Sequence, residues 1–294
     1  MKVSGFSFCR NAVRLYYPIA ESIRSALPLV DEFVIAVGEG DDGTREVIEA
    51  IDDPKIRIID TVWDETQFVR GATNSVQTNI ALDACTGDWC VYLQADEVLH
   101  EHDLPKIREA MQDTLDRPAV EGLLFNYLHF WATYDHVQKA RNWYRHEVRV
   151  VRNGIGVRSW ESAQGFRVDG RKLRVAPSGA RVFHYGWVRP PHAMKRKTIA
   201  LATLHHGQEG AEERHPHADE PFDYGTLAHL ARFEASHPAV MEERIRAQDW
   251  TLPAPGPNGQ SHEHNRRSTR LLGWVERHLL RRRLGEYRNY ELID

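Results

Sequence analysis

Two adjacent carboxylates, Asp96 and Glu97, follow a strongly apolar segment, residues 88–93, that is predicted to be a strand. Adjacent side chains of a strand point to opposite faces, so one carboxylate is expected to lead at a shared site, and we predict Asp96. An exposed carboxylate at a strand end is a natural ligand for Mg²⁺ or Mn²⁺, ions that also take diphosphate oxygens. The alternative is an acidic pair that only faces solvent.

A second candidate is the loop Gly38–Gly43, which satisfies G-x-G-x-x-G between a predicted strand and a helix, with Asp60 ending the next strand. This pattern is typical of dinucleotide binding. However, Glu39, Asp41 and Asp42 would repel a pyrophosphate, so the loop suits a base or ribose better. The dinucleotide pattern also normally follows the first strand of such a sheet. A glycine turn with an aspartate helix cap is the alternative.

His184 and Glu161 are two further candidates. His184 lies in a strand-like stretch ending at Gly186, where it is either a metal ligand or a packed, hydrogen-bonded residue. Glu161 follows an arginine-rich segment, residues 149–158, whose charges would keep its carboxylate ionised; the alternative is a surface salt bridge. Other histidines are predicted to lie in solvated loops, namely His205, His206, His215, His217, His262 and His264.

The elements that must position these side chains alternate between short strands and helices, the pattern of a mostly parallel sheet covered by helices. The expected strands are residues 3–8, 32–37, 55–59 and 88–93, and the expected helices are residues 11–26, 44–51 and 72–85. In such sheets ligands bind at the C-terminal ends of the strands. Asp96 and the Gly38–Gly43 loop are both expected at that edge.

The second half of the chain changes character. Long aromatic and β-branched runs over residues 120–151 predict antiparallel or mixed strands, and a helix is expected at 194–205. A His- and Glu-rich surface loop to residue 220, a Pro- and Gly-rich linker over 251–265 and a C-terminal helix should follow. We therefore predict an α/β fold with one domain over residues 1–190 and a mainly helical C-terminal region over 191–294.

Composition and charge exclude several classes of protein. The chain has 38 Lys and Arg against 42 Asp and Glu, a net charge of −4, so nucleic-acid binding is not expected. Three cysteines without a CxxC pair predict a reducing compartment. Arg10 and Arg14 interrupt the N-terminal apolar residues, so no secretory signal is expected, and the longest uncharged apolar run, residues 122–134, is too short to span a bilayer. We expect a cytoplasmic protein.

Four motifs occur in a characteristic order along residues 1–190. They are Phe8-Cys9-Arg10-Asn11 after the first strand, Asp42-Gly43-Thr44 after the second, Thr86-Gly87-Asp88-Trp89 before the acidic strand and Gln94-Ala95-Asp96-Glu97 after it. Together they resemble a family-two glycosyltransferase with the GT-A fold. The resemblance implies a Rossmann-related mixed sheet flanked by helices, and transfer of a sugar from a nucleoside-diphosphate donor to an acceptor hydroxyl.

The resemblance also implies roles for individual residues. Asp96 would hold Mn²⁺ or Mg²⁺, and His184 would be a further metal ligand. Gln94 stands where the family usually has an aspartate and is expected to contact ribose or sugar hydroxyls. Glu39 would substitute for an acid that contacts the base, whose own position is occupied by Gly38. The expected donor-binding residues are Phe8, Arg10, Glu39, Arg70, Gln94 and Asp96, and the resemblance extends to Asn74 and Asn79.

The implied mechanism is metal-assisted departure of the nucleoside diphosphate. Asp96 holds the metal ion, and the metal ion is the Lewis acid. In an inverting enzyme Glu161 is the first candidate for the base that deprotonates the acceptor hydroxyl, with Glu147 the second; a retaining enzyme needs no such base. The expected role is hexosyl transfer in surface polysaccharide or glycoconjugate synthesis. Two alternatives stay open: an NAD-type oxidoreductase using Gly38–Gly43, and a non-catalytic sugar-nucleotide-binding protein.

The C-terminal segment, residues 266–288, is rich in arginine and carries apolar residues at helical spacing. Such a segment either packs on the catalytic domain or makes peripheral contact with the inner face of an anionic membrane.

Overall fold

The computed structural model describes residues 1–64, 66, 68–252, 267–280, 285 and 287–293. Four strands near the N-terminus run parallel to one another in the order β3-β2-β1-β4. Their bounds are β1 (Val3–Cys9), β2 (Glu32–Gly38), β3 (Ile56–Thr61) and β4 (Trp89–Tyr92). Along the chain, one helix lies between each strand and the next: α1 (Ile19–Ala26), α2 (Thr44–Glu49) and α3 (Ala72–Asp83). The predicted alternation of strands and helices is confirmed.

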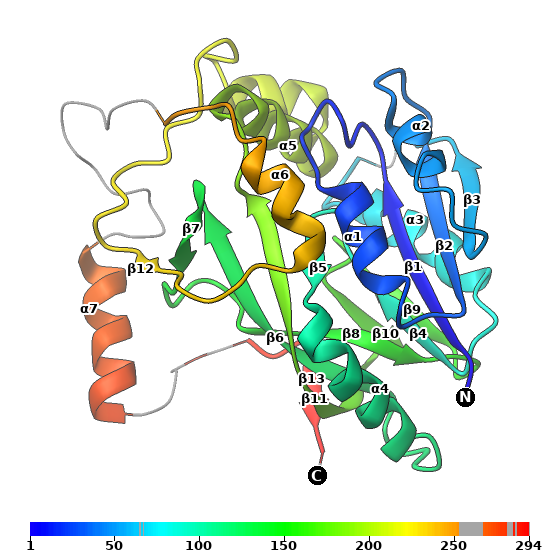
Figure 1. Ribbon diagram of the computed structural model, residues 1–294. Helices are drawn as coiled ribbons and strands as arrows, with labels where there is room; N and C mark the ends of the chain where they lie inside the picture. The colour runs from blue at the N-terminus through cyan, green and yellow to red at the C-terminus, as the bar shows by residue number, and fades with distance from the viewer. Residues whose placement is uncertain (65, 67, 253–266, 281–284, 286, 294) are drawn as a thin grey trace.

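The rest of the sheet is mixed. Beyond β4 the order continues β8-β6-β11-β10-β9, with β8 antiparallel to β4 and β6 but β11 parallel to β6. The remaining strands are β5 (Glu97–Leu99), β6 (Gly122–Trp131), β7 (Thr133–Gln138), β8 (His146–Arg152), β9 (Val157–Trp160), β10 (Gly165–Val168), β11 (Arg171–Trp187), β12 (Ala231–Arg232) and β13 (Tyr290–Leu292). The expected mixed sheet flanked by helices is confirmed (Figure 1).

Helices cover both faces of the parallel strands. Phe33 and Ile35 of β2 belong to one core cluster with residues of α1 and α4 (Leu104–Asp113), whereas Val34 and Ala36 belong to another with residues of α3. This alternation follows from the two-residue period of a strand. Figure 1 shows α1 and α4 on the near face of the sheet and α3 beyond it. Burial on both faces leaves the ends of the strands as the place for polar chemistry.

Helix α1 begins at Ile19, so the prediction that it begins near Asn11 is wrong. Asn11 and Tyr16 have φ of 54° and 59°, in the left-handed region that a helix cannot contain. The backbone N–H of Ala12 donates to Thr44 Oγ1, 2.7 Å away, and that of Arg14 donates to Asp42 Oδ2, 2.8 Å away. The β2–α2 loop therefore holds residues 11–16 in a turn beside the end of β1.

The described residues after β11 form helices and two short strands that extend the sheet. The helices are α5 (Pro191–Arg214), α6 (Glu242–Arg246) and α7 (Arg267–Val275), with the 3₁₀ helix η3 (Ala239–Met241) and the π-helix η5 (Glu276–Leu280). Helix α5 continues nine residues past His205, apart from a kink at Gly207, so the predicted loop is wrong over 206–214. Strand β12 pairs with β7, and β13 pairs with β11. Most of the predicted linker, residues 253–265, lies outside the described residues.

No helix among the described residues combines the length and apolar character that a membrane crossing requires.

Candidate functional site

A cavity of about 770 Å³ opens where β1 and β4 end. Its size is typical of a small-ligand site, and its position agrees with the rule that ligands of such sheets bind at the C-terminal ends of the strands. The predicted donor- or metal-binding residues that line it are Phe8, Arg10, Gln94, Asp96 and His184, and Asn74 lines it too. His205 of α5 is also part of the lining, so the prediction that it lies in a solvated loop is wrong. Aromatic side chains from four segments of the chain form much of the wall: Tyr17, Trp63, Phe68, Trp143, Tyr144 and Trp187.

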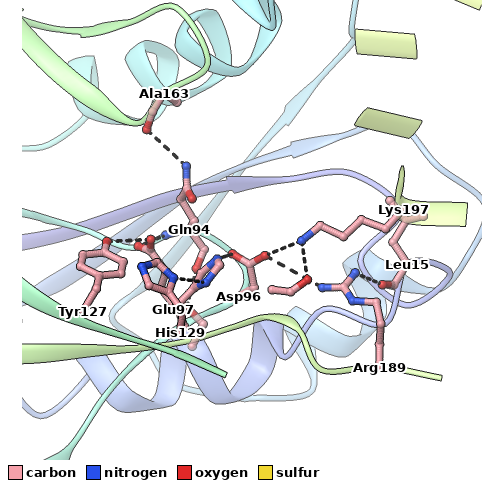
Figure 2. Close-up of polar contacts among 12 residues, drawn as sticks. Leu15, Gln94, Asp96, Glu97, Tyr127, His129, Ala163, Arg189 and Lys197 are labelled. Atoms are coloured by element: carbon pink, nitrogen blue, oxygen red, sulfur yellow. Dashed lines mark hydrogen bonds and ion pairs between the residues drawn. The ribbon is translucent and has the colours of Figure 1, made fainter. Parts of the chain in front are cut away.

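Asp96 lies at the floor of this cavity and is only 6% exposed, which corrects the expectation of an exposed carboxylate. Its Oδ2 is 3.1 Å from Lys197 Nζ and 3.9 Å from Arg189 Nη2, and its Oδ1 is 3.8 Å from His184 Nε2 (Figure 2). Burial alone would raise the pKa of this carboxyl, but Lys197, His184 and Arg189 lower it far below its usual range. Asp96 is therefore a buried, permanently ionised carboxylate.

Strand pairing places His184 beside Asp96. In the antiparallel β5–β11 pair His184 is opposite Glu97, and the backbone N–H of Tyr185 donates to the Asp96 carbonyl, 2.8 Å away. In the parallel β6–β11 pair His184 is the partner of His129. The two imidazoles face each other through their Nδ1 atoms at 3.0 Å.

The hydrogen bonds of His129 fix the tautomer of His184. Burial lowers the pKa of His129 to about 3 and that of His184 to about 4, so both rings are neutral at pH 7. His129 Nε2 lies 2.7 Å from the Tyr144 carbonyl, which can only accept, so we assign the ring proton to Nε2. His129 Nδ1 then accepts from His184 Nδ1–H. The lone pair of His184 is left on Nε2, the atom that faces Asp96.

A gap beside these two groups is kept open by Gly186. A Cβ at this position would lie 2.6 Å from His184 Nε2 and 2.7 Å from Asp96 Oδ2. A ring nitrogen with a free lone pair, a carboxylate and a second-shell partner that fixes the ring are features of a divalent-cation site. In the part of the chain that the structure describes, no cluster of three or more His, Cys, Asp or Glu side chains could hold a metal ion. The pair therefore fits an ion that takes its other ligands from substrate oxygens and water.

Glu97 faces the core instead of the cavity. Its carboxylate and the Arg149 guanidinium are both fully buried and form two short contacts, Nε to Oε2 at 2.7 Å and Nη2 to Oε1 at 2.8 Å. The same carboxylate accepts hydrogen bonds from Tyr127 Oη and from the backbone N–H of Gln94. This pair holds the turn Gln94–Glu97 in the shape that presents Asp96, as the opposite-face argument predicted.

The remaining predicted donor contacts divide into two groups. Gln94 lines the cavity and its Nε2 donates to the Ala163 carbonyl at 3.3 Å, while Arg10 lines the wall next to the Trp63 ring. Glu39 and Arg70 are exposed and do not line the cavity. The prediction that Glu39 shares this pocket is wrong: its backbone accepts from Arg10 Nε at 2.9 Å and donates to the Thr61 carbonyl at 2.8 Å, while its side chain is exposed and does not line the cavity.

The Gly38–Gly43 loop contributes no lining residue to the cavity of about 770 Å³ at the ends of β1 and β4, which we call the first cavity. Asp42 Oδ1 accepts from the backbone N–H of Thr44 at 3.2 Å and from its hydroxyl at 2.7 Å. Asp42 thereby uses an N–H group at the start of α2 that a pyrophosphate would need. Gly43, with φ of 80°, is the N-cap residue of α2, and Asp42 just before it bonds the first N–H group of the helix. This glycine turn is close to the alternative reading and speaks against dinucleotide binding here.

The two candidate bases have different environments. Glu161 is exposed in a left-handed turn, with φ of 49°, next to Ser162, which lines the first cavity. Glu147 is 5% exposed and lines a separate cavity of about 410 Å³. Burial raises the pKa of Glu147 to about 8, so it is mainly protonated at pH 7. Asn79, another residue of the resemblance, links α3 to β9 by accepting from the Ser159 N–H at 2.8 Å.

Three residues that the sequence did not point out complete the floor of the site: His129, Arg189 and Lys197. Lys197 follows the buried residues Ala193 and Met194 of α5 by four and three positions, so helical spacing places it on the buried face. This spacing could have identified Lys197 as a buried residue from the sequence alone. Arg189 precedes α5 and is fully buried.

Comparison with known proteins gives one family. The model of glycosyl transferase family 2 matches residues 11–167. No curated protein matches the chain. Among solved structures, S. aureus TarS in complex with UDP is similar, with 13% identity and a TM-score of 0.41, covering 69% of this chain and 65% of TarS.

Two further structures are similar over shorter stretches. Glucosyl-3-phosphoglycerate synthase from Mycobacterium tuberculosis, in complex with Mn²⁺, UDP and phosphoglyceric acid, has 18% identity and a TM-score of 0.30, and the match covers 44% of this chain and 43% of the synthase. The 4-diphosphocytidyl-2C-methyl-D-erythritol synthase from Anaerococcus prevotii has 10% identity and a TM-score of 0.33. The match covers 51% of this chain and 70% of that synthase. This chain thus spans less than two thirds of the first synthase and of TarS.

Proposed function

The chain belongs to glycosyl transferase family 2, and we propose that it transfers a hexosyl group from a nucleoside-diphosphate donor to an acceptor hydroxyl. One observation carries this proposal. Asp96 and the Nε2 lone pair of His184 meet across the Gly186 gap, at the floor of a cavity of about 770 Å³ where the parallel strands end. The mixed sheet flanked by helices agrees with the GT-A fold that this family implies.

The proposed donor lies along the wall formed by the ends of β1 and β4. Phe8 lies near the end of β1 and Arg10 follows it, and Gln94 and Asp96 follow β4, so one bound molecule can touch all four. We assign the nucleoside to the Phe8 and Arg10 side and the ribose or sugar hydroxyls to Gln94, whose amide oxygen accepts hydrogen bonds. The exposed positions of Glu39 and Arg70 leave both outside this assignment.

Asp96 and His184 are the residues that would hold Mn²⁺ or Mg²⁺. When bound, such an ion would supply positive charge against the departing diphosphate. His129 keeps the His184 lone pair directed at the site through the hydrogen bond described above. Glu97 and Arg149 fix the backbone turn that carries Asp96.

An inverting transfer needs a base for the acceptor hydroxyl, and we propose Glu161 for this role. Its carboxylate is exposed next to the cavity-lining Ser162, where an acceptor can reach it. Glu147 is the weaker candidate, because it is buried beside another cavity and mainly protonated at neutral pH.

We place the enzyme in the cytoplasm, in the synthesis of surface polysaccharide or glycoconjugates. Its three cysteines are free and buried, which supports a reducing compartment. For the basic segment 266–288, partly outside the described residues, two features bear on membrane contact. Buried Glu276 pairs with Arg141 at 3.1 Å, while Leu271, Trp274 and Leu279 are exposed. We propose that these three side chains make the peripheral membrane contact.

The experiment is a screen of UDP- and GDP-sugars for release of the nucleoside diphosphate, with and without Mn²⁺. Wild-type protein should release it from at least one donor, and Asp96→Asn should not. Asp83→Asn, which removes only a surface pair with Arg158, is the control. Because Asp96→Asn leaves two buried cations unpaired, we expect it to lose about 3–5 kcal/mol of stability, so circular dichroism must establish its folding; His184→Gln is the second variant. Absence of release from every donor by the wild type would contradict the proposal.

A further inference from the structure

The floor of the cavity carries more positive than negative charge. In the described part of the chain, Asp96 is the carboxylate that contacts the two buried cations Lys197 and Arg189. The charged residues among the described lining are Asp96 against Arg10 and Lys197. Arg189 adds a further positive charge behind them, fully buried. An excess of buried positive charge attracts and stabilises a negatively charged group, so this floor suits an anionic ligand.

Lys197 is the cation that can reach such a ligand. Its Nζ donates to Asp96 Oδ2 at 3.1 Å and to the Gly186 carbonyl at 2.7 Å, and the side chain lines the cavity. An ammonium has three N–H donors, so these two bonds leave one for a ligand. Figure 2 shows Lys197 and Arg189 on one side of Asp96 and His129 on the other. Lys197 thus approaches the carboxylate from the side opposite the histidine pair.

Arg189 is less able to move toward a ligand. Its Nη1 contacts the Leu15 carbonyl, its guanidinium lies 4.6 Å from the centre of the Tyr17 ring, and it does not line the cavity. Its fixed charge, however, repels any cation that approaches Asp96. A divalent ion arriving alone would meet Lys197 and Arg189 beside the same carboxylate. A diphosphate arriving first would offset that repulsion.

We propose that Lys197 binds the diphosphate of the donor, so that a nucleoside diphosphate binds this protein without a divalent cation and the metal ion binds only together with the nucleotide. The inference rests on the proposed function, since it assigns a residue to the same donor site. In the absence of nucleotide, the Lys197 ammonium occupies the position of positive charge next to Asp96.

A purely structural role is the rival explanation, in which Lys197 only neutralises Asp96. The two roles differ in what the phosphates contribute. If Lys197 binds phosphate, its removal weakens the binding of a nucleoside diphosphate but not the binding of the corresponding nucleoside. If it only neutralises Asp96, its removal affects both ligands alike, through the fold.

The test is titration calorimetry of UDP, GDP, uridine and guanosine into metal-stripped protein in EDTA, followed by Mn²⁺ with and without nucleotide. Wild type should bind UDP or GDP in EDTA. Lys197→Met should weaken that binding roughly 10- to 100-fold, because a charge-assisted hydrogen bond is lost. The nucleoside should bind as before. Arg196→Met, which removes the adjacent, exposed cation of α5, is the matched control and should change nothing. Mn²⁺ alone should bind Lys197→Met but not the wild type.

Nucleotide binding that appears only with Mn²⁺ overturns the inference and leaves the proposed function standing. Equal UDP or GDP affinity of wild type and Lys197→Met also overturns it. If neither nucleotide binds with or without Mn²⁺, the proposed function fails as well. Should Lys197→Met not fold, the wild type decides: nucleotide affinity in EDTA within about tenfold of that in Mn²⁺ supports the proposal, and a larger gap contradicts it.

Discussion

His129 and His184 face each other through their Nδ1 atoms at 3.0 Å, and the Tyr144 carbonyl on the far side of His129 decides which of the two rings donates. Through His184, His129 acts on the proposed metal site without being a ligand itself. His129 is therefore a positioning residue, and its effect should be visible in metal binding.

His129→Phe should weaken Mn²⁺ binding roughly 10- to 100-fold, measured by calorimetry with saturating nucleotide, because His184 loses the acceptor that fixes its tautomer. His237→Phe is the control, since His237 bonds to Tyr185 Oη and does not line the cavity. Unchanged Mn²⁺ affinity in a folded His129→Phe protein would show that the relay has no such role.

Gly186→Ala should close the gap between the two proposed ligands. The new Cβ would lie within 2.7 Å of both His184 Nε2 and Asp96 Oδ2, so the imidazole must shift. We expect Mn²⁺ binding in the presence of nucleotide to fall roughly tenfold or more. Gly273→Ala on α7 has its nearest new neighbour at 3.9 Å and should leave binding intact. Equal Mn²⁺ affinity of the two variants would contradict the assignment.

Glu161→Gln should lower kcat by roughly 10²- to 10⁴-fold, because an amide cannot accept the acceptor's proton, while donor affinity stays the same. The matched control is Asp169→Asn, an exposed carboxylate that also has φ of 49° and lies outside the cavity. The measurement is steady-state kinetics with the donor identified by the screen. A Glu161→Gln enzyme with wild-type kcat would remove Glu161 from the mechanism.

Glu147 should make the protein less stable as the pH rises. Its pKa is raised by burial from 4.5 to about 8, so the folded state holds a proton that the unfolded state releases, and the stability from this group is lost between those values. Glu147→Gln should match the wild type near pH 5 and unfold at a higher temperature at pH 8.5. At pH 8.5 the free energy of unfolding of Glu147→Gln should exceed that of the wild type by a few kcal/mol.

Glu121 offers a control of opposite sign. Although burial would raise the pKa of this carboxyl, hydrogen bonds from Arg171 and Arg174 lower it to about 2, so its stabilisation is fully present above pH 5. Glu121→Gln should therefore destabilise the protein at pH 5 and pH 8.5 alike. Thermal unfolding of both variants across this range checks the pair; a Glu147→Gln protein less stable than wild type at pH 8.5 would contradict the buried-carboxyl account.

The sequence predicted those parts of the site that follow directly after strands. Gln94 and Asp96 follow the end of β4, and a position after a strand is a local property that a hydrophobic run and its polar exit reveal. The partnership of His129 with His184 was not predictable in this way, because it depends on the register between β6 and β11, which are far apart in the sequence. Strand register over such separations is set by packing of the whole sheet.

The errors have equally local causes. Asn11 lies in a regular apolar pattern, but side chains of the β2–α2 loop satisfy its neighbours' N–H groups and prevent a helix. Glu39 lies one residue after the position expected for the base-contacting acid, which Gly38 occupies, and its side chain is exposed. Lys197 was missed because it is one of three consecutive cations, Lys195, Arg196 and Lys197. Only the helical spacing from the buried residues of α5 shows that Lys197 is the one on the buried face.

The most direct test of the account is calorimetry of the wild-type protein with UDP, GDP and NAD, each in the presence of Mn²⁺. The account predicts saturable binding of UDP or GDP, since the cavity at the ends of β1 and β4 holds the Asp96 and His184 pair, and no detectable binding of NAD, since Asp42 caps the start of α2. Saturable binding of NAD with no response to UDP or GDP would contradict it.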